Sequence, residues 1–323
     1  MTTVVQAEGA ILQRIVATTP LVAYSGLSRE AFAKYDAAQA KTQWALRHRR
    51  RFALMQADAV LASAERYDLT GRLDRQLVTI CGIAAVLDNG ADDDGRRYGD
   101  VLVEQLLEAA SRDGADLALL FRTAGPASPL PAGFMVVPTT DVELTVTESS
   151  RHGAPMTLVR GGEDRDLGAI VAMGHARAHP FRFHIDRDVD LVKHAITRKR
   201  LLAGLGFAGV RQLEFVIAEE GITAAAYIAI SIVGNAWTIE ECGDRDASGA
   251  RVGAILQALI AREPAESRPV IRGWLPPGFL PPQVTIASAS AAPPLLLARA
   301  LSSRVRGLHL TAPEVMYWRS DLF

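Results

Sequence analysis

The sequence predicts an α/β protein made of two lobes, each with a mixed, mostly antiparallel sheet flanked by helices. Residues 115–121 form a continuous apolar run, which is typical of a strand buried on both faces. Residues 101–112 place five apolar side chains on one face of a helix. A strand, a glycine-bearing loop and a helix then recur in the same order in the second half of the chain, which favours two similar lobes.

The first half of the chain predicts helices followed by strands. Helical patterns occupy residues 1–50, and Gly114 is a natural end for a later helix because glycine adopts the left-handed conformation of a C-terminal cap. The basic run at 47–51 is interpreted as a solvated helix end that runs into a strand, because no aromatic platform accompanies it. The predicted strands lie at 52–55, 60–69, 76–87, 115–121, 134–137 and 141–147, and the predicted helix at 101–112.

A polar break at 148–153 is the predicted boundary, so residues 1–150 and 151–323 are expected to form the two lobes. The proline-rich stretch 275–283 is expected to be a rigid loop. Beyond the boundary, predicted helices lie at 167–178, 189–202 and 254–262, and predicted strands at 213–218, 223–233, 237–242 and 269–274.

The composition excludes several classes of protein. The formal net charge of −1 argues against a general nucleic-acid binder. Cys81 and Cys242 lie far apart in apolar runs and are expected to be buried thiols in a reducing compartment. No apolar run is long enough to span a membrane, and the first residues lack the basic start of a secretory signal. We therefore expect a cytoplasmic protein without a membrane partner, and association between identical chains is left open.

Two loop–helix units share a short motif. Residues 95–99 and 249–253 both read Gly-x-Arg-x-Gly, and the offset between them is constant at 154 (253 − 99). With this offset, apolar positions of the two following helices also coincide. The matched order of elements around the motif favours duplication of one unit.

A glycine-bearing loop before a helix presents backbone N–H groups and the positive end of the helix dipole, so it suits a phosphate. Neither a P-loop nor a dinucleotide-binding fingerprint is present. The residues instead resemble the GNAT acyltransferase superfamily, in particular its large two-lobed members. The resemblance covers most of the chain and rests on residues 94–99, 114–121, 125–134, 237–246 and 275–283.

The resemblance implies two GNAT-like lobes, with 1–150 as the acyl-CoA-binding lobe, and acetyl-CoA or another acyl-CoA as co-substrate without a metal. In that family the strand before the loop diverges from its neighbour, the pantetheine arm lies in the gap, and the loop holds the pyrophosphate. Asp94 and Arg97 depart from the family's usual residues, and no tyrosine stands at 128–132, where the family often has its general acid. The implied cofactor-binding residues are Leu87, Gly95, Arg96, Arg97, Tyr98, Gly99 and Asp100.

Acyl transfer to an amine requires the neutral amine. An amine with a pKa of about 10.4 is neutral roughly once in 2,500 at pH 7, a cost of about 4.6 kcal/mol that a carboxylate or a dry pocket must offset. Glu240 and Asp244 belong to the densest acidic group and are the candidate catalytic residues that hold the positive charge of the acceptor. The alternative interpretation of this group is a solvated rim of charges.

The sequence thus predicts an acyltransferase that moves an acyl group from acyl-CoA to a small-molecule or peptide amine by direct attack. The alternative is a GNAT-like binding or scaffold protein that has lost the chemistry. His175 and His179 are spaced four residues apart on a predicted helix, with His184 nearby. No acidic or cysteine ligand completes an obvious set, so no metal site is expected.

Overall fold

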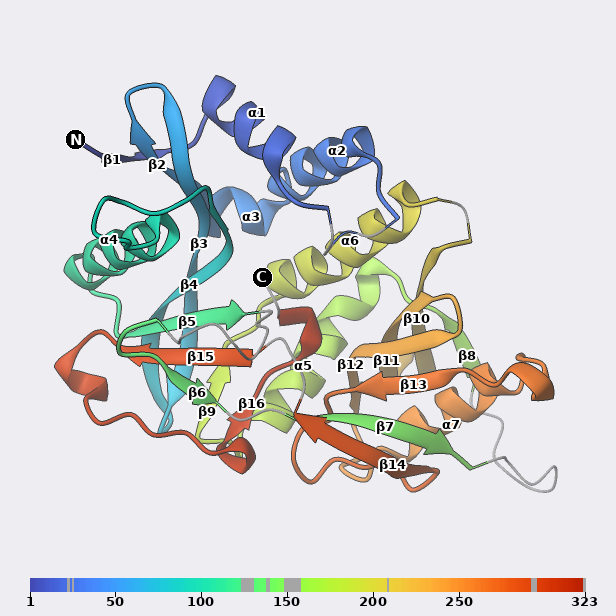
Figure 1. The fold of residues 1–323 in the computed structure, drawn as a ribbon. Helices are drawn as coiled ribbons and strands as arrows, with labels where there is room; N and C mark the ends of the chain where they lie inside the picture. The colour runs from blue at the N-terminus through green and yellow to red at the C-terminus, as the bar shows by residue number, and fades with distance from the viewer. Residues whose placement is uncertain are drawn as a thin grey trace.

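A computed structural model describes residues 1–21, 24, 26–122, 131–137, 140–147, 158–207, 209–291 and 295–321. Figure 1 shows two sheets with helices beside and between them. The predicted α/β class with two mixed sheets is confirmed. No helix in the described ranges has the length and apolar character needed to cross a membrane.

The N-terminal part begins with a short strand and three helices, and then forms the predicted hairpin and the helix after it. Ser28 and Thr42 start two of these helices, because their hydroxyl oxygens accept the backbone N–H groups of Ala31 and Ala45. The elements are β1 (Thr3–Gln6), α1 (Gly9–Thr18), α2 (Arg29–Ala40), α3 (Gln43–His48), β2 (Arg49–Gln56), β3 (Ala59–Leu73), β4 (Gln76–Asp88), α4 (Tyr98–Arg112), β5 (Leu117–Arg122), β6 (Met135–Val137) and β7 (Thr140–Val146).

The C-terminal part alternates helices and strands and ends in short elements that pack back on the core. Its strands β14 and β15 and the short β8 and β9 are absent from the sequence-based prediction. The elements are β8 (Leu158–Gly161), α5 (Leu167–Ala178), β9 (Phe183–Ile185), α6 (Val189–Leu205), β10 (Arg211–Glu220), β11 (Thr223–Val233), β12 (Ala236–Asp244), α7 (Ala250–Ile260), β13 (Val270–Gly273), β14 (Val284–Ala291), β15 (Leu295–Ala300) and β16 (Val315–Met316).

The two sheets exchange strands across the expected boundary at residue 150. The first sheet has the order β1-β2-β3-β4-β5-β15-β6, so its penultimate strand comes from the C-terminal part. The second sheet has the order β14-β7-β13-β12-β11-β10-β8, so one of its strands comes from the N-terminal part. Each sheet is therefore completed by a segment from the other half of the chain.

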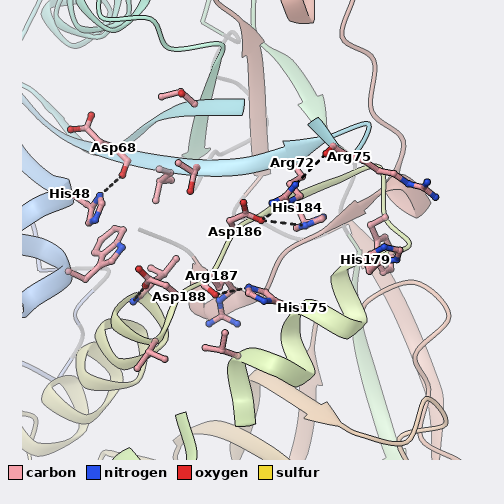
Figure 2. Close-up of a pocket in the computed structure, with 18 residues that line it drawn as sticks. His48, Asp68, Arg72, Arg75, His175, His179, His184, Asp186, Arg187 and Asp188 are labelled. Atoms are coloured by element: carbon pink, nitrogen blue, oxygen red, sulfur yellow. Dashed lines mark hydrogen bonds and ion pairs between the residues drawn. The ribbon is translucent and has the colours of Figure 1, made fainter. Parts of the chain in front are cut away.

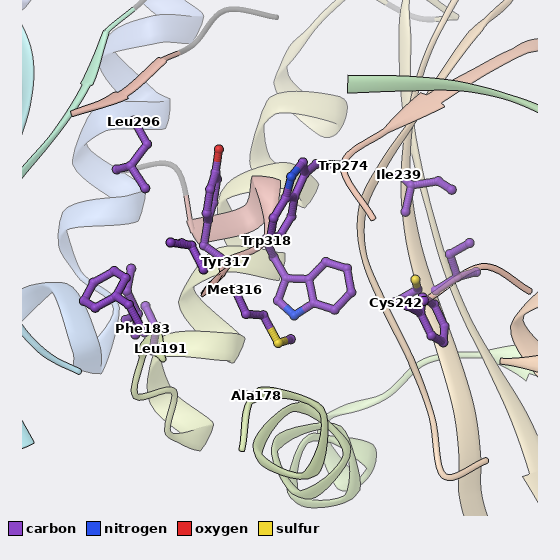
Figure 3. Packing of buried hydrophobic residues seen from close by; sticks show 14 of the residues in the cluster. Ala178, Phe183, Leu191, Ile239, Cys242, Trp274, Leu296, Met316, Tyr317 and Trp318 are labelled. Carbon is purple, nitrogen blue, oxygen red and sulfur yellow. The ribbon is translucent and has the colours of Figure 1, made fainter. Parts of the chain in front are cut away.

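One continuous apolar core joins the two sheets. Helix α4 covers one face of the first sheet, where Leu102 and Leu106 pack against strand residues such as Ile83. The other face belongs to a larger core that also contains residues of the second sheet. Figure 3 shows Trp318 and Tyr317, from the C-terminal segment, between Leu296 of the first sheet and Ile239 of the second. This segment thus fastens the lobes together by burying two large aromatic side chains.

The basic run at 47–51 passes from the end of α3 into β2, as the sequence predicted, but only part of it is solvated. Arg49 and Arg51 point inward from β2 and form ion pairs with Asp36 of α2 and Glu65 of β3. The Arg49 Nη2 lies 2.6 Å from Glu65 Oε1 and 2.8 Å from Asp36 Oδ1. Alternate residues of a strand face opposite ways, so only every second arginine of the run is buried.

Both cysteines are free and buried, as expected from the sequence. Cys81 packs beneath α4 and Cys242 lies in the main core. Burial raises the pKa of the Cys81 thiol to about 12. A thiol held in its protonated form is a poor nucleophile, so neither cysteine is a candidate for covalent catalysis.

Candidate functional site

Strands β4 and β5 pair for only part of their length and then diverge. They run parallel from Ile80 opposite Leu117 to Ile83 opposite Leu120. Beyond this point β4 continues to Asp88 beside β3, while β5 continues to its end beside β15. The two strands therefore separate in the direction of the loop that precedes α4.

A β-bulge marks the place where the divergence begins. Glu65 of β3 pairs with Ala84, but Ser63 pairs with Leu87, so β4 carries one extra residue between these pairs. Ala85 has a φ of 48°, which lies in the left-handed region that an alanine rarely adopts. A bulge sharpens the local twist and frees backbone groups from the ladder. After Ile83, the edge of β4 away from β3 has no strand partner among the described residues.

The N-terminus of α4 sits directly on the end of β4. A Cβ atom on Gly99 would lie 3.1 Å from Asp88 Oδ2 and 3.2 Å from Val86 Cγ1, so a larger residue would require these side chains or the helix to shift. The N–H groups of the first helical turn have no partner within the helix. Gly99 and Asp100 belong to that turn, and their N–H groups therefore form the anion-attracting end of the helix dipole.

The loop before α4 is closed by its own acidic residues. The Asp92 carboxylate accepts the backbone N–H of Asp94 at 3.2 Å and that of Arg96 at 2.8 Å. Asp88 accepts a hydrogen bond from the Arg97 Nε at 2.7 Å. Two of the loop amides that would meet a phosphate are thus satisfied internally, and the Arg96 side chain is left exposed to solvent.

The structure brings the cofactor-binding residues predicted from the sequence into one region. Leu87 lies on β4 just after the bulge, and Tyr98 packs its ring against the α4 side of the sheet. The remaining members follow one another through the loop and the first helical turn: Gly95, Arg96, Arg97, Gly99 and Asp100.

Glu240 and Asp244 lie on β12, away from this loop in sequence and with partners of their own. Glu240 is 5% exposed and its Oε2 lies 2.8 Å from the Lys199 Nζ. Burial opposes ionisation of Glu240, but Lys199 outweighs it and holds the pKa of the carboxyl below its ordinary value. Asp244 accepts the Arg251 backbone N–H at 2.8 Å and thereby caps α7. Both carboxylates are therefore engaged inside the second lobe.

The aromatic residues near the acidic strand end and in or next to the 275–283 loop are part of the core. Trp237, Trp274 and Phe279 are each less than a tenth exposed and belong to the cluster that joins the two sheets. The Trp274 ring stacks on Tyr317 with centroids 4.5 Å apart. These side chains contribute to stability, and the acidic strand end is not a solvated rim.

The second lobe repeats the backbone pattern of the first. Strand β12 pairs in parallel with β13 from Ala236 to Ile239, and Glu240 is then the extra residue of a bulge opposite β11. Helix α7 follows, as the repeated motif predicted. A Cβ on Gly253 would overlap Gln283, whose Nε2 donates to the Ala250 carbonyl at 3.1 Å. The segment after β13 therefore occupies the start of α7.

A further cavity in the described part of the chain lies elsewhere and was not predicted from the sequence. It measures about 800 Å³ and lies between β3, α3, α5 and the start of α6 (Figure 2). Four of the seven histidines of the chain line it: His48, His175, His179 and His184. The spacing of His175 and His179 was visible in the sequence. His48 and His184 come from α3 and β9, and only the fold brings them to the same cavity. Among the described residues, no group of three or more His, Cys, Asp or Glu side chains suits a metal ion.

Strands β4 and β5 separate after a bulge, and a helix with Gly99 in its first turn begins at the end of β4. Solved structures of similar overall fold match most of the chain. A GCN5-related N-acetyltransferase from Anabaena variabilis superposes with a TM-score of 0.66 at 12% identity, over 94% of this chain and 73% of that one. The fold is that of the GCN5-related N-acetyltransferases.

Other solved structures share the GNAT fold with this chain. A GCN5-related N-acetyltransferase from Kribbella flavida matches with a TM-score of 0.63 at 15% identity, covering 93% of this chain and 71% of that one. The N-myristoyltransferase of Saccharomyces cerevisiae, solved with bound myristoyl-CoA, matches with a TM-score of 0.55 at 10% identity, covering 92% and 82%. No family model and no curated protein matches the sequence.

Proposed function

We propose that this protein transfers an acyl group, with acetyl as the first candidate, from acyl-CoA to an amine on a small molecule or peptide. The observation that carries the proposal is the bulged divergence of β4 from β5, which ends at the N-terminus of α4. Pantetheine is a chain of amide groups, and an unpaired strand edge offers matching N–H and C=O groups. The N-terminus of a helix is in turn suited to a pyrophosphate.

The reaction needs little side-chain chemistry in this proposal. The neutral amine attacks the thioester carbonyl carbon, the carbon–sulfur bond breaks, and the CoA thiolate takes up the proton that the amine loses. The N–H groups freed at the bulge around Ala85 polarise the thioester carbonyl, and the rigid strand fixes its orientation. We assign Glu240 and Asp244 no step, because their carboxylates already hold Lys199 and the start of α7.

A second candidate, a GNAT-fold binding or scaffold protein, is favoured by one specific observation. The loop that would meet the pyrophosphate carries Asp92, Asp93 and Asp94, and the first of these occupies two of its amides. Like charges a few ångströms apart at a surface repel by about 1 to 4 kcal/mol. Arg96 and Arg97 offset only part of this charge.

Calorimetric titration of acetyl-CoA, followed by assay of free CoA release with a panel of amines, tests the proposal. Micromolar affinity and amine-dependent release of CoA are expected. Binding without transfer to any amine in the panel would favour the scaffold alternative. If acetyl-CoA did not bind at millimolar concentration, the assignment of β4, β5 and α4 as an acyl-CoA site would be wrong.

A further inference from the structure

The cavity between β3 and α5 takes no part in the proposed acyl transfer. Strand β3 pairs with β2 up to Tyr67 opposite Arg49 and with β9 from Gly71 opposite Ile185. Between these two partners, residues 68–70 have no paired strand in the described part of the chain, although the Thr70 carbonyl accepts the Asp186 N–H at 3.0 Å and the Asp68 carbonyl lies 3.0 Å from the His48 Nδ1; the cavity lies beside this stretch. Its volume of about 800 Å³ is in the range of sites that hold small organic ligands.

The walls of the cavity are mainly apolar. Trp44 and Leu69 line it on one side, and Leu191 at the start of α6 lies beside them. Phe181 and Val171 add apolar surface from the α5 side. A ligand with a hydrophobic, preferably aromatic, body gains the free energy of burying that body against these side chains, at about 25 cal/mol per Å².

The carboxylates that line the cavity already have cationic or backbone partners. Asp68 forms ion pairs with Arg50 and Arg66. Asp186 Oδ1 lies 3.4 Å from the Arg72 Nε. Asp188 accepts the backbone N–H of Leu191 at 2.7 Å and caps α6. The acidic groups are therefore neutralised within the protein and leave little negative charge to attract a cationic ligand.

Two polar groups at the cavity differ from these carboxylates. His184 is 8% exposed; its Nε2 lies 3.7 Å from Asp186 Oδ1, and its Nδ1 has no hydrogen-bond partner among the described residues. Burial lowers the pKa of its imidazole, so the ring is neutral at pH 7 and its unpaired nitrogen needs a polar group. Arg75, on the exposed turn after β3, brings a guanidinium to the rim with no carboxylate beside it.

Helix α6 begins at Val189, which lines the cavity, and Asp188 and Asp190 already offset the positive end of its dipole. His175 also donates its Nε2–H to the Arg187 carbonyl at 2.9 Å, which fixes the orientation of that ring on the cavity wall. Figure 2 shows His184, Arg75 and His175 around the same space, contributed by different elements.

We propose that this cavity binds an organic acid, in which a carboxylate is held near Arg75 and His184 and an apolar body lies against Trp44 and Leu69. The anion is favoured over a cation because the lining acids are paired and Arg75 is not. This binding does not depend on acyl transfer, because the cavity residues are not those of the β4–β5 separation.

Calorimetric titration with 3-phenylpropionate tests the proposal, with 3-phenylpropan-1-ol as the neutral probe of the same shape. We expect the acid to bind one molecule per chain and at least fivefold more tightly than the alcohol. In proton NMR spectra, the Cε1–H signals of His175 and His184 are expected to shift on titration, and that of His309, which lies outside the cavity, to stay fixed.

Arg75→Gln is expected to weaken binding of the acid about fivefold at low salt, because it removes an exposed charge partner worth up to about 1 kcal/mol. Arg306→Gln is the matched control, since Arg306 is also exposed and lies outside the cavity. Equal affinity for acid and alcohol would overturn the proposal. So would undiminished acid binding by Arg75→Gln, or failure of the acid to bind at millimolar concentration.

Discussion

The buried ion pairs of Arg49 and Arg51 allow a quantitative test of how the N-terminal helices are held to the first sheet. Glu65 is 4% exposed and accepts hydrogen bonds from Arg49 Nε at 2.8 Å, from Arg51 and from the Tyr67 hydroxyl. Two arginines thus face two carboxylates, Glu65 and Asp36. Glu65→Gln removes one charge and leaves the arginines with a single buried counterion.

Loss of one partner from a buried ion pair costs about 3 to 5 kcal/mol, because the remaining charge is left desolvated. Unfolding entropies of about 2.1 cal/mol/K per residue imply that 323 residues lose roughly 1.5 °C in Tm per kcal/mol. Glu65→Gln is therefore expected to lower the Tm by about 4 to 7 °C in differential scanning calorimetry. Asp68→Asn, which breaks only partly exposed pairs, is the control and should cost less than about 1 kcal/mol.

The effect of Glu65→Gln should depend on pH in a defined direction. Burial alone would raise the pKa of Glu65, but Arg49 and Arg51 hold it well below its ordinary value. A group whose pKa is depressed by folding stabilises the protein above its unfolded pKa of about 4.3 and loses that contribution as the pH falls. The Tm difference from wild type should thus be largest above about pH 5 and shrink below pH 4. A variant melting within 1 °C of wild type at pH 7 would refute this reasoning.

Three further predictions concern the loop and the acidic strand end. Replacing Arg96 and Arg97 together by alanine should weaken acetyl-CoA binding severalfold, and more at low than at high salt, which calorimetry at two ionic strengths would show; equal affinities would place the phosphates elsewhere. Gly99→Ala should weaken acetyl-CoA binding, because the added methyl group shifts α4 away from Asp88 and Val86. Gly168→Ala, with open space at its Cβ, should not weaken it. If both variants bound acetyl-CoA equally well, the close approach at Gly99 would not be needed for binding. Asp244→Asn should lower the free energy of unfolding by about 1 kcal/mol, because Asp244 caps α7, and should leave the KM of any amine substrate unchanged. A raised KM with an unchanged Tm would instead identify Asp244 as a residue that binds the acceptor.

The sequence predicted the elements whose stability is local. Helix α4 and the hairpin of β3 with β4 have clear periodicity, and they appear within a few residues of the expected bounds. Strand β14 was missed because much of its apolar and polar alternation is carried by small Ala and Ser side chains, and Ala is depleted in strands. Strand β15 was missed although Pro293-Pro294 in the sequence marks a break before it, because its run of six residues is short and its partners β5 and β6 lie far away in the sequence.

The sequence predicted the candidate site only where the residues of the site are contiguous in the chain. The loop and the first turn of α4 are contiguous, so a short motif sufficed to locate them. The bulge at Ala85 depends on the pairing of β4 with β3, and the inward turn of Arg49 depends on Asp36 and Glu65 from other elements. The cavity likewise lies between α3, β3, α5 and β9. The residue pattern within one segment cannot predict that these four elements lie close together.

The exchange of β7 and β15 between the sheets has a consequence for synthesis on the ribosome. Strand β5 needs β15, which ends at Ala300, so its outer edge stays unpaired until nearly the whole chain has emerged. Strand β7 likewise waits for β13 and β14. Exposed strand edges pair readily with other chains, so a growing chain is most prone to aggregate during this interval. When residues 1–150 are expressed alone, β15 is absent, and the outer edge of β5 stays unpaired.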